Sequence, residues 1–318
     1  RERERERERT RASLTMADNN DPDDNENLNG NDNEGSGAID DLPWYEYPLG
    51  QRRIPDHVTH LRIGVQPALA AGANGTAPEI IVLPSRFCRG YPNLQQVQIH
   101  VHTMEAIPDY SFHECRNMQK VEFVATAGQG STASTRSNPP VQPKITEIGF
   151  CAFSTCPKLH SVIGLEHVSC SLGRIGFGAF GCCGKLTTLE LPCLTRVELL
   201  EGYAFSYCYS LTVVDLSNSV MLEAIRAYTF KRCKTMKVIR LPPNLKWIGC
   251  GALQECSALV SIVIPARVEF MAYRTFEACS SLMQVTLQST RPLRTLMNDQ
   301  QFFGCTSLHT LELQGPTI

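Results

Sequence analysis

Apolar residues recur along this chain at a fixed internal spacing. Eight times an aromatic or aliphatic residue is followed three positions later by cysteine and six positions later by leucine or methionine. The copies begin at Phe112, Phe153, Phe180, Phe205, Phe230, Leu253, Phe276 and Phe302. Successive cysteines of the copies are separated by 41, 27, 25, 25, 23, 23 and 26 residues. Repetition at such a period predicts a solenoid, in which each repeat buries its apolar side against its neighbours.

Each copy continues into the pattern Leu-x-x-Leu-x-Leu, whose last positions alternate between apolar and polar residues as in a β-strand. With a degenerate copy ending in Gly164 and an extra copy at Val58–Leu61–Ile63, the pattern predicts ten parallel strands. A second apolar pair follows most strands, as in Leu222–Ile225. We interpret the recurring Ala-Phe-x-x-Cys-x-x-Leu as one or two helical turns on the other side, with Phe, Cys and Leu pointing inward.

The chain divides by composition. Residues 1–43 are charged, acidic and poor in large apolar residues, so we expect a disordered N-terminal tail. Residues 44–318 form the predicted repeat domain of nine to ten repeats, and Trp44, Tyr45 and Tyr47 are expected to cover its first repeat. Two stretches rich in Gly and Pro, 66–78 and 125–143, interrupt the period and are predicted loop insertions.

Cysteine use and charge narrow the class of protein further. Eight of the fourteen cysteines share one phase of the repeat, which favours a reduced, buried ladder over disulfides. A net charge of −2 without a long basic run gives no reason to expect nucleic acid. The sequence shows neither a membrane-spanning apolar run nor a signal peptide, which favours a cytoplasmic location. Because the chain begins with Arg1 rather than Met, an incomplete N-terminus would change that expectation.

Several local patterns resemble chemical sites. Gly176-x-Gly178-x-x-Gly181 matches a dinucleotide fingerprint but lacks the strand–turn–helix context, so we assign it to the repeat. His100 and His102 alternate on one predicted strand, as two metal ligands would, yet no third ligand follows at a suitable spacing. Cys182 beside Cys183 is expected to be a single thiol outside the ladder, and Asn74 begins a glycosylation sequon. We expect no cofactor, no metal and no catalytic residue.

The unit from Leu245 to Pro265 resembles the BspA-type leucine-rich repeat. It reads Leu-x-x-Ile-Gly-x-x-Ala-Leu-x-x-Cys-x-x-Leu-x-x-Ile-x-Ile-Pro, and the resemblance covers roughly residues 54–318. It implies an α/β leucine-rich-repeat solenoid, a right-handed horseshoe with a parallel β-sheet on one face and short helical turns on the other. It also implies protein binding or adhesion, and it carries no catalytic residues that could be transferred to this chain.

The outward positions of the strands, on the concave face of such a horseshoe, are the candidate surface for a protein partner. Regular neighbours would hold these side chains in register, and their mixed polarity with several valines is typical of a protein interface. The candidates are Thr188, Glu190, Val213, Asp215, Val238, Arg240, Ser261, Val263, Gln284 and Thr286. We therefore expect a non-enzymatic interaction scaffold. Two alternatives remain open: a cell-surface adhesin or receptor fragment, and a regulatory arm of an enzyme whose catalytic domain lies outside this chain.

Overall fold

The computed structural model describes residues 44–47, 54–64, 81–125, 144–189, 195–288 and 300–314, apart from the side chains of Thr188 and Leu189. They all belong to one compact unit, Trp44–Ile318. The predicted tail, residues 1–43, lies outside the described residues, and so do insertion 66–78 and all but the first residue of insertion 125–143. Within the described part of the chain, no helix is long and apolar enough to cross a bilayer.

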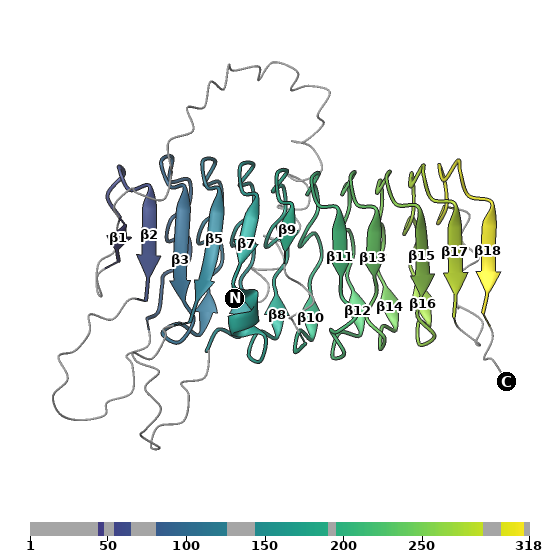
Figure 1. Cartoon of the computed structure of the whole chain (residues 1–318), viewed down its shortest axis with the longest axis horizontal. Coiled ribbons are helices and arrows are strands. Elements are labelled where there is room, and N and C mark those ends of the chain that lie inside the picture. Colours follow the sequence, from purple (N-terminus) through teal and green to yellow (C-terminus); the bar gives the residue numbers. More distant parts are fainter. Residues whose placement is uncertain are drawn as a thin grey trace, which may run out of the picture. The chain divides into compact units, whose positions relative to one another are not determined.

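All ten predicted strands form, and they succeed one another along one side of the unit (Figure 1). They pair in parallel within three sheets, whose strand orders are β1-β2-β3-β5-β7-β9, β11-β13 and β15-β17-β18. An additional short strand, β1, pairs with the first of them, so the expected aromatic segment does lie at the head of the ladder. The strands of this side, called the long ladder below, are β1 (Tyr45–Glu46), β2 (His60–Ile63), β3 (Gln96–His100), β5 (Lys120–Val124), β7 (Ser161–Ile163), β9 (Thr188–Leu189), β11 (Val213–Asp215), β13 (Val238–Arg240), β15 (Ser261–Ile264), β17 (Gln284–Leu287) and β18 (Thr310–Leu313).

The second apolar pair of each repeat builds another parallel sheet of two-residue strands. One residue of each strand, such as Ile225 or Ile248, is buried, and the other residue of the same strand faces outward. The sequence pattern indicated these apolar pairs but not that they form paired strands. The seven strands are β4 (Ala106–Ile107), β6 (Glu147–Ile148), β8 (Arg174–Ile175), β10 (Leu199–Leu200), β12 (Ala224–Ile225), β14 (Trp247–Ile248) and β16 (Phe270–Met271).

The predicted helical turns around the Phe–Cys signature are absent: the only helix among the described residues is the 3₁₀ helix η3 (Leu165–Val168). Alternate N–H groups donate instead to carbonyls of the next repeat. The N–H of Phe153 donates to the carbonyl of Ala179, at 2.8 Å between N and O. Cys151 and Thr155, two residues to either side, have φ of 48° and 58°. An α-helix needs negative φ at every residue, so the residues with positive φ prevent a helix here. The segments of successive repeats form turns that are hydrogen-bonded to one another, and we call this arrangement the ladder of turns.

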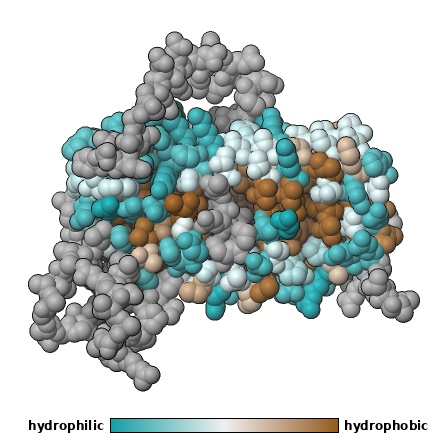
Figure 2. Space-filling model, viewed as in Figure 1, coloured by the Kyte–Doolittle hydropathy of each residue, from teal (hydrophilic) through white to brown (hydrophobic). Residues whose placement is uncertain are grey.

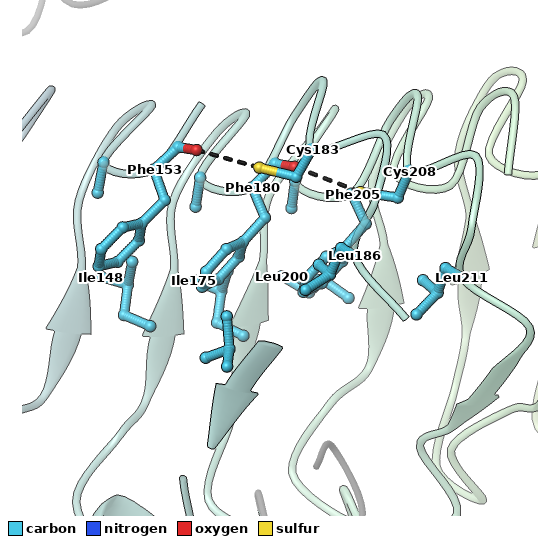
Figure 3. Close-up of a cluster of buried hydrophobic side chains, with 14 of the residues drawn as sticks. Ile148, Phe153, Ile175, Phe180, Cys183, Leu186, Leu200, Phe205, Cys208 and Leu211 are labelled. Carbon is cyan, nitrogen blue, oxygen red and sulfur yellow. Dashed lines mark hydrogen bonds between the residues drawn. The ribbon is translucent and has the colours of Figure 1, made fainter. Parts of the chain in front are cut away.

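The phenylalanines of successive repeats stack in one buried column, as predicted. The rings of Phe112, Phe153, Phe180, Phe205 and Phe230 follow one another with centroids 5.1–5.6 Å apart and planes within 8° of parallel. Figure 3 shows three of these rings side by side above the isoleucines and leucine of the short-strand sheet. All five rings are at most 1% exposed, so burial of apolar surface stabilises the column along much of its length.

The cysteine column has a role that the sequence did not reveal. Each thiol of the signature donates to the carbonyl of a turn in the preceding repeat, as Cys183 Sγ does to Phe153 O at 3.1 Å and Cys208 Sγ to Phe180 O at 3.3 Å (Figure 3). A buried carbonyl without a partner would be costly, and Cys is a small, apolar residue that still carries a weak donor. All thirteen cysteines of the described chain are free thiols.

Two copies of the repeat depart from the regular pattern. In the first full repeat Cys88 occupies the phenylalanine position. Its hydrogen bonds show this equivalence: its N–H donates to Ser111 O, and its carbonyl accepts from Cys115 Sγ. In the degenerate copy the strand stops at Gly164, which has a φ of 78°. A Cβ there would lie 2.0 Å from the carbonyl oxygen of Phe123, so no larger residue fits.

Candidate binding surface

The predicted partner-binding positions lie in two columns along the outer side of the long ladder. The first column contains Thr188, Val213, Val238, Ser261 and Gln284, and the second contains Asp215, Arg240, Val263 and Thr286. Glu190 lies outside the described residues, as does the side chain of Thr188. Register holds the columns: Val213 is opposite Val238, and Asp215 is opposite Arg240.

An exposed apolar patch lies over the long-ladder strands β11, β13, β15 and β17. Val213, Val238 and Val263 are 49%, 38% and 47% exposed. Val263 lies in the second column, beside Arg240, whereas the other two valines are direct neighbours in the first. Two further members, Val260 and Met283, were not predicted from the sequence, and they are 43% and 44% exposed. Figure 2 shows the hydrophobic surface gathered mainly over these strands. We call these five residues the apolar patch.

The two missed residues occupy the position just before a strand. Met283 N donates to Val260 O at 2.8 Å, so the two residues are neighbours across the ladder. The same position holds Thr212 and Lys237 in the preceding repeats and His309 in the last one. Aligning that single position across the repeats would have shown two consecutive apolar residues at an exposed site.

An ion pair borders the patch. Arg240 Nη1 lies 3.0 Å from Asp215 Oδ2, and the arginine side chain is 59% exposed. The Ser217 hydroxyl, which donates to the Asp215 carboxylate, lowers the pKa of Asp215 together with Arg240. Asp215 therefore carries its charge at neutral pH, and this exposed pair adds little stability but fixes a local charge pattern.

Exposure differs among the remaining candidates. Ser261 is exposed and Gln284 is half-buried, but Thr286 is only 5% exposed. Thr286 stands between Val263 on β15 and Glu312 on β18, and its hydroxyl oxygen lies 3.5 Å from Glu312 Oε2. Thr286 therefore shares the register of the outward column, but its neighbours cover it and leave little of its side chain accessible.

The beginning of the long ladder is polar. Arg62 Nε donates to Gln98 Oε1 at 2.7 Å, and Gln98 Nε2 donates to Glu122 Oε2 at 3.1 Å. Lys120 Nζ lies 3.3 Å from the same oxygen of Glu122. The side chains of this part of the face are thus paired with one another, whereas the apolar patch has no comparable bonding to satisfy.

Other residues that the sequence suggested as chemical sites have structural roles or lie outside the described chain. A Cβ on Gly176 would lie 2.7 Å from the carbonyl carbon of Gly149, so the glycine permits close approach of neighbouring repeats. Cys182 is half-buried in the ladder of turns with a φ of 61°, whereas Cys183 belongs to the buried column. The sequon at Asn74 lies outside the described residues.

His100 is the last residue of β3, whereas His102 lies in the turn that follows, so the two histidines do not alternate on one strand as predicted. The Nδ1 atoms of His100 and His102 are buried and have no hydrogen-bond partner among the described residues. Burial lowers the pKa of His100, so its imidazole is neutral at neutral pH. The described residues contain no group of three or more His, Cys, Asp or Glu side chains placed to hold a metal ion.

Comparison with known proteins identifies related repeats. The model of the BspA type leucine rich repeat region matches residues 82–129, 131–222 and 198–317, with six copies. Among solved structures, a leucine-rich repeat protein from Bacteroides ovatus is 20% identical, with a TM-score of 0.45, over 73% of this chain and 63% of that one. This chain thus covers less than two thirds of that protein. The leucine-rich repeat protein of T. pallidum is 22% identical, with a TM-score of 0.37, over 62% of this chain and 70% of that one. No curated protein matches.

Proposed function

Because this chain belongs to the BspA-type leucine-rich repeat family, we propose that it is a non-enzymatic scaffold that binds a protein partner on the outer face of its long ladder. The observation that carries the proposal is the apolar patch. Its members Val213, Val238 and Val263 are each 38–49% exposed although they lie in regular strands. Contiguous apolar surface on a regular sheet is a typical site of protein association.

The sheet supports binding in two ways. The backbone of β11, β13 and β15 is held by neighbouring repeats, so a partner need not order it on association. Burial of one exposed valine contributes up to about 1.5 kcal/mol, so a few such side chains supply the apolar centre of an interface. The pair of Asp215 and Arg240 then lies at the border of the patch, where charges favour one orientation of the partner over others.

The test is partner capture from native cell extract, followed by affinity measurement with the protein identified. We expect the triple variant Val213→Asp, Val238→Asp, Val263→Asp to bind at least about tenfold more weakly, because central interface residues each contribute more than about 1 kcal/mol. Circular dichroism should stay unchanged, since all three side chains are already exposed.

A matched control places three aspartates on exposed apolar residues outside the patch. Val82, Val220 and Met221 are 85%, 47% and 49% exposed and lie in no strand of the long ladder. Their variants should keep the wild-type affinity. Equal losses for both triple variants, or wild-type binding by the patch variant, would remove this face as the binding site.

A further inference from the structure

A second surface feature lies on the short-strand sheet, apart from the proposed protein-binding face. Strands β12, β14 and β16 border a hollow of about 440 Å³. Its principal lining residues are Arg226, Trp247, Gly249, Phe270, Ala272 and Tyr273. The volume is within the range of pockets that accept one small molecule.

The hollow exists because two consecutive repeats carry only glycine and alanine at the same position. Gly249 and Ala272 directly follow the buried residues of β14 and β16, where the preceding repeat carries Arg226. Gly249 cannot be larger, since a Cβ would lie 2.5 Å from the backbone nitrogen of Ala227. The floor of the hollow is therefore backbone and one methyl group, and larger side chains rise only around it.

The walls of the hollow are aromatic. Trp247 and Phe270 lie with ring centroids 4.0 Å apart and planes tilted by 32°. Trp247 and Tyr273 are each 47% exposed. The core does not require these rings, because the outward position of the short strands is filled by Ala224 in β12 and by Arg174 in β8. Two large, exposed rings beside a backbone floor form a site for a flat apolar group.

A cation at the rim determines the charge that this site favours. Arg226 is exposed and forms no ion pair with any residue that the structure describes, whereas its neighbours on the surface are paired. Arg174 contacts Glu147 and Glu201, and Lys246 Nζ lies 2.7 Å from Glu223 Oε1. An unpaired guanidinium next to aromatic walls favours a carboxylate attached to a ring.

We propose that this hollow binds a small aromatic carboxylate, with its ring against Trp247 and Tyr273 and its carboxylate on Arg226. The proposal is independent of the protein-binding face, because none of these residues belongs to the long ladder. An ammonium group would be repelled by Arg226, so the site differs from aromatic cages that bind cations.

The chain provides its own reporter for this site. It contains two tryptophans, Trp247 in the hollow and Trp44 at the far end of the repeats, where the Arg62 guanidinium lies over its ring. Protein labelled with 5-fluorotryptophan therefore gives two fluorine resonances, which the variant Trp44→Phe assigns. We would titrate it with 1-naphthoate, 1-naphthalenemethanol and 1-naphthylmethylamine, which share one ring system and carry negative, zero and positive charge.

We expect 1-naphthoate to shift the Trp247 resonance saturably and to leave the Trp44 resonance unchanged. It should bind up to about fivefold more tightly than the neutral alcohol, as one exposed ion pair allows, and the amine should bind most weakly. In Arg226→Gln the three affinities should converge. The lining variant Tyr273→Ala should weaken all three ligands.

Other outcomes would overturn the proposal. They are equal shifts of both tryptophans, absence of a saturable Trp247 shift, tightest binding of the amine, or an unchanged preference for naphthoate in Arg226→Gln. Arg226 is exposed, and its guanidinium forms no ion pair with a residue that the structure describes. Circular dichroism of that variant should therefore match the wild type, so misfolding will not mimic a negative result.

Discussion

The stacked phenylalanine column makes a graded prediction, because its members differ in how many stacking partners they have. Phe205 is fully buried between Phe180, 5.4 Å away, and Phe230, 5.6 Å away. Phe302 is half-buried and, among the rings that the structure describes, stacks on Phe276 alone, at 5.4 Å. Phe303 is 67% exposed and contacts no other ring of the described chain. Three alanine variants thus compare two, one and no stacking partners.

The expected losses follow from burial. Truncation of a buried phenylalanine to alanine costs about 3–5 kcal/mol, and each ring contact contributes about 0.5–1.5 kcal/mol beyond buried area. We therefore expect Phe205→Ala to lower the free energy of unfolding by about 5 kcal/mol and Phe302→Ala by about 2 kcal/mol, whereas Phe303→Ala should stay within about 0.5 kcal/mol.

Urea unfolding followed by circular dichroism measures the three values. Repeat arrays can unfold in parts, so the slope of the transition must be equal for wild type and variants before midpoints are converted to free energies. The stacked column would be refuted if Phe205→Ala and Phe303→Ala were equally stable, or if Phe302→Ala were more damaging than Phe205→Ala.

Two further predictions concern the glycine and cysteine positions. Gly176→Ala should lower the urea midpoint by the equivalent of about 1–3 kcal/mol, because the new Cβ would lie 2.7 Å from the carbonyl carbon of Gly149. Gly173→Ala is its control, with a nearest contact of 3.9 Å, and equal losses in both would contradict the close approach. Burial raises the pKa of Cys233 from 9.0 to about 12, so the unfolded chain releases this proton at lower pH than the folded chain. The contribution of this thiol to the free energy of unfolding is fully present below pH 9. It should fall above pH 9, by up to about 1.4 kcal/mol per pH unit for each such thiol. Urea midpoints between about pH 8 and about pH 10 should therefore fall less steeply in Cys233→Ala than in wild type, and equal slopes would disprove this linkage.

The hydrophobic pattern was sufficient to predict the ten strands and the Phe and Cys columns. It could not predict the ladder of turns, because the sign of φ is not encoded in apolar spacing. Glycine would signal a positive φ, and Gly178 and Gly251 do occupy such positions. The equivalent residues Tyr203 and Tyr228 have φ of 57° without being glycine. Bonds to the next repeat compensate for that strain, and such bonds become visible only when the repeats are placed side by side.

The candidate surfaces were predictable to different degrees. Val213, Val238 and Val263 could be read from strand alternation, because an outward position needs only the period of the strand. The burial of Thr286 could not, since it depends on how Val263 and Glu312 of the two neighbouring strands pack around it. The hollow beside Trp247 was missed because it requires the absence of large side chains in two repeats, at Gly249 and Ala272, and a pattern of apolar positions does not record missing volume.

Separate columns allow this fold to change its surface without changing its core. Val121 and Val214 are both fully buried in equivalent strands, yet the residues just before them are Lys120 and Val213. A substitution at Val213 therefore changes what the face offers to a partner, while the buried neighbour still stabilises the strand. If the proposed binding face is correct, stability and binding depend on different positions of the same repeat. Variants of the apolar patch should then lose binding without losing the fold, and variants of the phenylalanine column should lose both.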